Sequence, residues 1–246
     1  MGTPEQPGAR TALLDAAERL FAERGIGSVS LREVGAAAGQ RNNSAAQYHF
    51  GSRDGLLRAV FERRMGPIND RRRAMLDDLG AEGRTDDRRA LVEALVLPLA
   101  ESVTSTDESC YARFLAQVLA SGLVGSGEDA LTEAFRDAHG RLVAGLDHVP
   151  ATLRRVRVDH AVLLAVHALA AWEQSRSLDR MATAPSLLVV DLVDSALGLL
   201  DAPATSLATS LATTPATTPP ATTPPATTPP APPPRPTPGP TLELAC

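Results

Sequence analysis

The amino-acid sequence predicts an all-α protein with an N-terminal helix-turn-helix three-helix domain and a larger C-terminal helical domain. Apolar residues recur every three or four positions from residue 9 to residue 201, which is the period of an amphipathic helix. No segment shows the sustained alternation of β-branched and polar residues that is typical of strands. The 246 residues allow one or two domains, and 43% of them are hydrophobic, enough for a core.

The first helix is predicted over about Arg10–Arg24, because its apolar residues form one stripe and Gly25 ends it. The next helix starts more sharply. Ser30 and Glu33 have the spacing of a capping box, in which each side chain accepts a hydrogen bond from the other residue's amide. This second helix is expected to stop at Gly39. The inward-facing residues of the two helices are Leu13, Leu14, Ala17, Leu20, Phe21, Leu31, Val34 and Ala38.

A polar turn at 40–43 precedes a short predicted helix over about 44–50, and Ser52 can cap a fourth helix that carries Leu56, Leu57, Val60 and Phe61. The short helix exposes polar side chains in place of a full apolar face. This pattern is typical of a helix-turn-helix, whose second helix enters the major groove of DNA. Gln and Asn can pair there with adenine, and Arg with guanine.

Longer helices are predicted after Pro67, because proline ends or kinks a helix. Pro98 lies inside one of them and predicts a kink, whereas Pro150 and Pro185 suit helix starts. The predicted spans are 68–80, 86–105, 109–123, 127–148, 151–178 and 185–201.

The C-terminal segment 203–246 is rich in Pro, Thr and Ala, and is predicted to be a disordered, partly polyproline II tail. With residues 1–8 as a disordered N-terminus, the expected domains are 9–66, which carries the helix-turn-helix, and 67–202. The tail could be a passive extension or a ligand for a polyproline-binding domain. The rival hypothesis of a scaffold that acts through this tail predicts that its deletion abolishes function.

Charge and cysteine content exclude several classes of protein. The net charge of −5 is too balanced for a polybasic protein, and two cysteines, Cys110 and Cys246, are too few for a disulfide-stapled secreted domain. The polar start has no signal-peptide core, and no run of about 18 apolar residues predicts a membrane span. We therefore expect a cytoplasmic protein without a membrane partner.

Three stretches of residues 10–61 resemble the DNA-binding domain of the TetR family of bacterial regulators: ALLDAAERLFAERG, SLREVGAAAGQ and QYHFGSRDGLL. The specific elements are Leu-Phe-Ala-Glu-Arg-Gly, an Ala-Gly turn, and Tyr-His-Phe followed by Gly-Ser-Arg. The sequence departs from the family's pattern in two places. Val34-Gly35 stands where the family usually has Ile-Ala, and the turn 40–43 is one residue longer.

The resemblance implies a homodimer that binds double-stranded DNA, most simply a ligand-responsive repressor at a palindromic operator. Gln47 and Tyr48 would face the groove, and Arg53, where the family usually has Lys, would meet a phosphate at a helix N-terminus. Asn42 and Asn43 are also ordinary turn residues, so both interpretations stay open for them. The DNA-binding residues implied are Ser30, Arg41, Asn42, Asn43, Ser44, Gln47, Tyr48, His49 and Arg53.

Charge is distributed unevenly along the chain. Residues 1–73 contain 12 Arg and 8 acidic residues, a net charge of +4, whereas the remainder has a net charge of −9. The positive end therefore coincides with the predicted DNA-binding domain. The run Arg71–Arg73 is interpreted as a solvated helix face.

The resemblance implies that the larger domain forms a dimer and holds a small-molecule effector, and the apolar candidate lining favours an apolar one. The same apolar residues could instead be ordinary core within one subunit. Dimer contacts are predicted for Val158, Val162, Ala165, Leu169, Trp172, Leu188, Leu192 and Leu197. The predicted pocket is lined by Leu95, Leu99, Phe114, Leu115, Val118, Leu119, Phe135, Leu142 and Leu146.

No catalytic or metal-binding motif is present in the sequence. His160 and His167 lie on one helix face but about 10 Å apart, too far for one ion. We therefore expect no cofactor, no metal and no enzymatic activity. The alternative is a helical small-molecule-binding protein or an enzyme that uses the apolar pocket, and DNA affinity that depends on Gln47 and Tyr48 would discriminate between the two.

Overall fold

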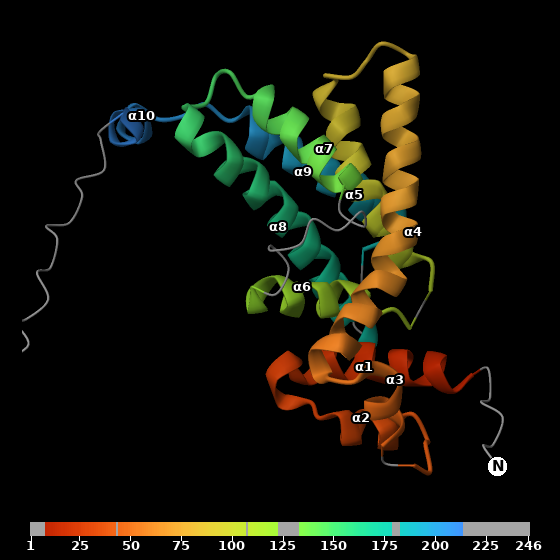
Figure 1. Ribbon diagram of the computed structural model, residues 1–246. Helices are drawn as coiled ribbons and strands as arrows, with labels where there is room; N and C mark the ends of the chain where they lie inside the picture. The colour runs from red at the N-terminus through yellow and green to blue at the C-terminus, as the bar shows by residue number, and fades with distance from the viewer. Residues whose placement is uncertain (1–7, 43, 107, 123–132, 179–182, 214–246) are drawn as a thin grey trace, which may run out of the picture.

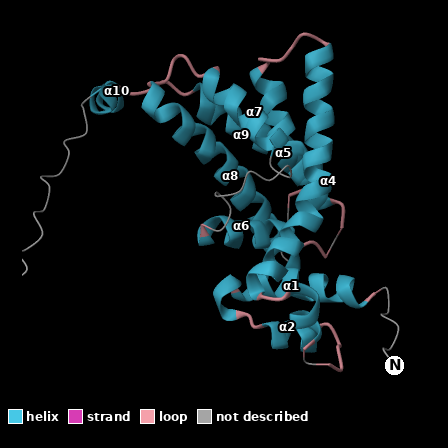
Figure 2. Cartoon of the chain, viewed as in Figure 1, coloured by secondary structure: helices cyan, strands magenta, loops and turns pink. Residues whose placement is uncertain are grey.

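The computed structural model describes residues 8–42, 44–106, 108–122, 133–178 and 183–213. All regular structure in these ranges is helical, so the predicted fold class is confirmed (Figure 1 and Figure 2). One end of the molecule is the unit of α1 to α3, and the long α4 leads from it to a bundle of α5, α7, α8 and α9. The helices are α1 (Ala9–Arg24), η1 (Ile26–Ser28), α2 (Leu31–Ala37), α3 (Ala45–Phe50), α4 (Arg53–Ala81), α5 (Arg88–Thr104), α6 (Tyr111–Ser121), α7 (Glu133–Ala144), α8 (Ala151–Ser177), α9 (Pro185–Asp201) and α10 (Ser206–Thr213).

The N-terminal unit forms as the sequence predicts. Gly25 ends α1 with a φ of 80°, a conformation that favours glycine. The capping box at the start of α2 is present: the Glu33 amide donates to Ser30 Oγ at 3.3 Å, and the Ser30 amide donates to Glu33 Oε2 at 2.9 Å. Ser52 caps α4 by accepting a hydrogen bond from the Gly55 amide at 3.0 Å.

The helix break predicted at Pro67 is wrong, because α4 runs without interruption from Arg53 to Ala81. The residue before a proline is normally kept out of the helical conformation by its Cβ, and here that residue is Gly66, which has none. Tertiary packing supports both halves of the helix, since α1 packs on α4 and so do α5 and α7. The predicted domain boundary between residues 66 and 67 therefore falls inside one helix.

The remaining helices follow the prediction with one shortening. The helices predicted at 86–105, 109–123, 151–178 and 185–201 are α5, α6, α8 and α9, with Pro98 inside α5. The helix predicted at 127–148 ends at Ala144, and residues 127–132 lie outside the described residues. The turn after α7 buries Leu146 and Val149, and Arg154 Nε donates to the Val149 carbonyl at 2.9 Å.

The prediction of a tail without structure from residue 203 is wrong for its first part, which contains α10. Between Pro203 and Pro215 the chain consists only of Ala, Ser, Thr and Leu, so no proline interrupts a helix there. The Ala208 amide donates a hydrogen bond to Thr205 Oγ1 at 3.2 Å, which is a capping contact. α10 lies away from the bundle (Figure 1). Residues 214–246, with the proline repeats, lie outside the described residues.

The helix α6 joins the N-terminal unit to the bundle, because it packs on both α1 and α8. Its fully buried Phe114 has its ring centroid 6.2 Å from that of Phe21 in α1. The Tyr111 ring also stacks on that of Phe114, with centroids 5.9 Å apart. The apolar core is therefore continuous between the two parts. None of the helices that are described is both long enough and apolar enough to cross a membrane.

We predict that the capping box makes stability depend on acid pH. Hydrogen bonds from Ser30, with Arg24 nearby, lower the pKa of Glu33 from 4.5 to about 2. Because the folded-state pKa is depressed, this stabilisation is complete above pH 4.5 and is lost as the pH falls toward 2. Glu33→Gln keeps a capping acceptor but does not titrate. Urea unfolding at pH 6 and pH 3 should show the wild type losing stability relative to the variant, and equal losses would contradict the assignment.

Candidate functional site

The short helix α3 presents the most exposed aromatic side chain among the described residues. Tyr48 is 82% exposed, and its ring makes a T-shaped contact with the His49 ring, with centroids 5.4 Å apart. On the opposite side of α3, Ala46 is fully buried and holds the helix against the core. The opposite face of α3 is thus packed on the core, and the exposed Tyr48 ring and its polar neighbours form a surface that is suited to binding a partner.

The residues around α3 make local hydrogen bonds that fix the turn. Asn42 Oδ1 accepts from the Ser44 amide at 2.9 Å, which is the bond of an ordinary Asx turn and favours the turn interpretation of Asn42. Gln47 is exposed, and its Nε2 donates to the Gly51 carbonyl at the end of the helix. Arg41 is exposed, His49 is half-buried, and Asn43 lies outside the described residues.

Arg53 lies at the first position of α4, beside a shallow depression that Ser30 and Ser52 also line. Its Nη1 donates to the Gly27 carbonyl at 3.2 Å, which holds the guanidinium between the start of α4 and the segment before α2. The free amides of a helix N-terminus and a nearby guanidinium both favour an anion. Ser30 faces the same depression, but its hydroxyl is bonded to Glu33 Oε2 at 2.7 Å.

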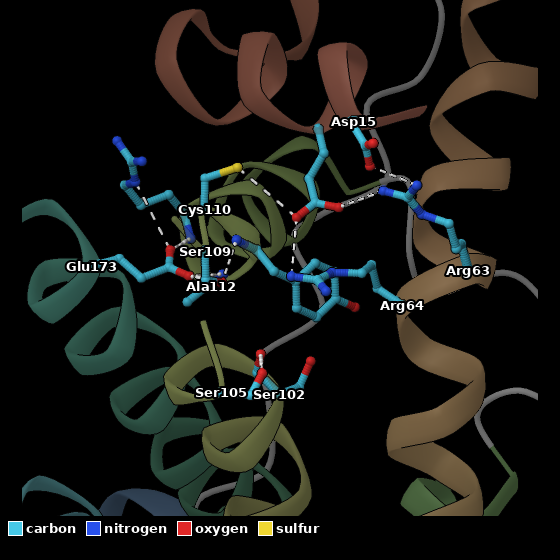
Figure 3. Close-up of polar contacts among 12 residues, drawn as sticks. Asp15, Arg63, Arg64, Ser102, Ser105, Ser109, Cys110, Ala112 and Glu173 are labelled. Carbon is cyan, nitrogen blue, oxygen red and sulfur yellow. Dashed lines mark hydrogen bonds and ion pairs between the residues drawn. The ribbon is translucent and has the colours of Figure 1, made fainter. Parts of the chain in front are cut away.

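An ion cluster around the buried Glu18 ties α1 to α4 (Figure 3). Glu18 is almost fully buried, and its carboxylate oxygens lie 3.3 Å from Arg63 Nη2 and 3.2 Å from Arg64 Nη2. Arg63 also pairs with Asp15 at 2.7 Å. Burial raises the pKa of Glu18 above its usual range, although the two guanidiniums beside it act in the opposite direction. The α1–α4 contact is therefore a specific charge pairing as well as an apolar one.

The thiol of Cys110 extends this cluster toward α6. Its Sγ lies 3.9 Å from Glu18 Oε1. Burial, and then the nearby Glu18, raise the pKa of this thiol to about 12, so it stays protonated and donates to the carboxylate. The Arg64 guanidinium lies over the ring of Tyr111, 5.0 Å from its centroid. The first residues of α6 thus contact the same charges that join α1 to α4.

Glu173 of α8 caps the other side of α6. Its carboxylate accepts hydrogen bonds from the amides of Ala112 at 3.2 Å and Arg113 at 3.0 Å, and from the Ser109 hydroxyl at 2.7 Å (Figure 3). The side chain is almost completely buried. A carboxylate at a helix N-terminus satisfies amides that otherwise have no partner. This cap fixes α6 to α8. It could not be predicted from local sequence, because the two segments lie far apart in the chain.

An apolar cavity of about 110 Å³ lies in the bundle, between α4, α5, α6, α7, α8 and α9. Of the predicted lining, Leu95, Leu99, Leu115, Leu119, Phe135 and Leu142 contact this cavity. Three predicted residues do not line it: Phe114, Val118 and Leu146 are buried core elsewhere. The lining residues that were not predicted for the pocket come mainly from α8 and α4: Val158, Ala161, Val162, Ala165 and Val166 of α8, and Phe61, Met65, Ile68 and Arg72 of α4.

The interpretation of Arg71–Arg73 as a solvated face is wrong for its middle residue. Arg72 is only 3% exposed, whereas Arg71 is exposed and lies 3.5 Å from Glu101. A signal for this was present in the sequence. Arg72 falls four residues after Ile68 and four before Leu76, so it occupies the apolar stripe of α4.

Most of the predicted dimer residues are turned into their own subunit. Val158, Ala165, Leu169, Trp172 and Leu192 are buried within the chain, and Val158, Val162 and Ala165 line the cavity. The five buried residues therefore have little surface to offer a second copy, whereas Val162, Leu188 and Leu197 are half-buried. The sequence left both possibilities open for these residues, because α8 has apolar residues on two faces. The exposed apolar residues of α8 and α9 are Val156, Leu163, Leu164, Leu187 and Val190.

Comparisons with known proteins bear on the N-terminal unit first. A family model described as bacterial regulatory proteins, tetR family, matches residues 13–60. The HTH-type transcriptional repressor KstR2 of Rhodococcus jostii (strain RHA1) is 33% identical over 109 residues, which are 42% of this chain and 48% of that protein. The chain thus matches about half the length of this curated relative.

Solved structures show similarity over more of the chain at lower identity. SCO4454, a TetR-family transcriptional regulator from Streptomyces coelicolor, is 20% identical, with 79% of this chain and 95% of that chain covered and a TM-score of 0.44. NalD, the secondary repressor of the MexAB-OprM multidrug efflux pump in Pseudomonas aeruginosa, is 19% identical, with 77% and 93% covered and a TM-score of 0.45.

We predict that Glu173→Ala lowers the free energy of unfolding by about 3 kcal/mol, because three donors at the start of α6 lose their acceptor together. The matched control is Glu101→Ala, which removes an exposed carboxylate that pairs with Arg71 and should cost less than about 1 kcal/mol. Urea denaturation of both variants measures the difference. Equal, small effects would show that water replaces the cap.

Proposed function

We propose that this chain is a TetR-family transcriptional regulator that binds DNA as a homodimer, because a model of that family of bacterial regulatory proteins matches residues 13–60. The observation that carries the proposal is the exposed surface of α3, with Gln47 and Tyr48, on a helix whose back is buried. The relative KstR2 is described as a transcriptional repressor, which favours repression over activation for this chain.

Each subunit would place α3 in one major groove, with Gln47 and Tyr48 facing base edges. Arg53, with the amides at the start of α4, would hold a backbone phosphate and set the register. Ser44, Arg41 and His49 would flank this contact. The net charge of +4 on residues 1–73, in a chain of net charge −5, favours approach to DNA by this end.

Two copies would join through the exposed apolar residues of α8 and α9. Leu187 and Val190 are 62% and 57% exposed, and a patch of this kind marks an interaction surface. On α8, Val156, Leu163 and Leu164 recur at helical spacing and form an exposed stripe. An isologous pairing of the two helices in each subunit would bury these residues in a symmetric dimer.

The cavity in the bundle would be the effector site. Its volume of about 110 Å³ is well below the roughly 300 Å³ at the lower end of ligand pockets, so a larger effector must push the lining helices apart. Arg72 in the lining and Arg53 at the DNA face belong to the same α4, about 28 Å apart along its axis. An effector that favours a displaced α4 would shift the population of dimers toward conformations in which the two α3 helices no longer fit the operator.

The test is a selection from genomic fragments at physiological salt, read by sequencing, with the full chain. We expect enrichment of a palindrome whose half-sites lie about one helical turn apart or a multiple of it, because two α3 helices must reach equivalent grooves. Leu187→Asp, on the exposed face of α9, should enrich no palindrome. Enrichment of single half-sites by the wild type would reject the dimer, and no enrichment would reject the proposed function.

Once the selected site is known, the variants Arg53→Ala and Gln47→Ala distinguish contacts to phosphate from contacts to bases. Arg53→Ala should weaken binding to all DNA sequences alike and lower the slope of log affinity against log salt by about one per subunit. Gln47→Ala should weaken binding chiefly at the selected site. Titration by fluorescence anisotropy over a range of salt concentrations measures both. If Arg53→Ala changed only the preferred site, Arg53 would be a base reader.

A further inference from the structure

Arg72 is a buried cation in the wall of an otherwise apolar cavity. The other side chains that line the cavity are Phe, Met, Leu, Ile, Val or Ala. The guanidinium lies over the Phe135 ring, 5.5 Å from its centroid, so one of its faces is covered by another lining residue. Burying a charge is costly unless it is paired and hydrogen-bonded.

Pro98 leaves free one of the carbonyls that hold this arginine in place. Because proline has no amide hydrogen, the carbonyl four residues earlier, that of Ala94, has no donor within α5. Arg72 Nε donates to this carbonyl at 3.0 Å, and Nη2 donates to the Leu95 carbonyl at 3.3 Å. The guanidinium is therefore fixed across from α4 to α5 in one orientation.

The third nitrogen of the guanidinium, Nη1, is buried and has no hydrogen-bond partner, and no carboxylate pairs with Arg72 among the described residues. The two backbone carbonyls explain the orientation of the side chain, but they do not neutralise its charge. Burial lowers the pKa of Arg72 to about 10, so the side chain still carries its charge at neutral pH. A positive charge and a free donor thus remain at the wall of the cavity.

We propose, on the basis of the proposed effector site, that the cavity binds a monoanionic amphipath. Its apolar body would lie against the aliphatic lining, and its carboxylate head would accept a hydrogen bond from Arg72 Nη1. A carboxylate matches the planar guanidinium and cancels its single charge. A doubly charged phosphate head would leave a net negative charge buried in the same apolar wall, which is unfavourable. The ligand class is therefore a carboxylic acid with an extended apolar part.

The experiment is displacement of the neutral fluorophore N-phenyl-1-naphthylamine from the full chain by straight-chain carboxylates, from hexanoate to hexadecanoate, and by alcohols of the same lengths. We expect at least one carboxylate to bind about ten-fold or more tightly than its alcohol, the effect of one charge-assisted hydrogen bond in a buried site. Arg72→Met should remove this preference while leaving alcohol binding unchanged or stronger.

Two further variants control for folding and for charge as such. Arg72→Lys keeps a cation and should retain part of the preference, whereas Arg71→Gln removes the exposed neighbouring charge and should change nothing. Thermal unfolding and DNA binding of each variant check that the helices are intact. If Arg72→Met does not fold, loss of the preference in Arg72→Gln, which keeps a donor for the Ala94 carbonyl, decides the question.

The inference is overturned if no chain length shows a preference for the carboxylate, or if the preference survives in Arg72→Met. Either result leaves the proposed regulator untouched, since operator selection judges that separately. Failure of the selection together with a carboxylate preference that depends on Arg72 would instead support a carrier of organic acids.

Discussion

The unbroken helix α4 is the constraint on which the rest of the structure depends. Its first residue, Arg53, lies beside α3, its middle is paired with α1 through Arg63 and Arg64, and its second half lines the cavity. A continuous helix transmits a displacement at one end as a rotation or shift at the other, because its backbone hydrogen bonds keep it rigid. The N-terminal unit and the bundle are therefore mechanically joined, whatever each of them binds.

Buried polar groups make the joint between the two parts specific. Glu18 pairs with two guanidiniums at a position that apolar side chains could also have filled. Glu173 caps the N-terminus of α6 by accepting three hydrogen bonds. Such groups contribute little net stability, but each is costly once its partner moves away. The packing of α6 between α1 and α8 thus has a defined geometry, and a shift of α6 must break or remake these contacts together.

Proline lies inside a continuous helix at two points, and the two are accommodated in different ways. At Pro67 the preceding Gly66 lets α4 continue, so the break expected from the sequence does not occur. At Pro98 the helix also continues, and the carbonyl that loses its donor is satisfied by Arg72 from the neighbouring helix. The missing amide hydrogen of Pro98 in α5 thus helps to fix the position of the Arg72 guanidinium of α4. Neither outcome follows from the local rule that proline ends a helix.

Local sequence determined what depends on neighbours within a few residues. The helical class, the capping box of Ser30 and Glu33, the end of α1 at Gly25 and the spans of α8 and α9 follow from periodicity and capping chemistry. Six of the pocket residues were also predictable, because an apolar stripe on α5, α6 or α7 must face the bundle.

Tertiary structure decided which of the two apolar faces of α8 is buried. Val158 and Ala165 lie in the cavity wall, whereas Leu163 and Leu164 are exposed to solvent. A stripe on one helix does not indicate its partner. The same limit explains Glu173, whose partners lie some sixty residues earlier in the chain, and Arg72, whose acceptors belong to another helix. Pairings across such distances depend on how the helices pack, and packing is a property of the whole chain.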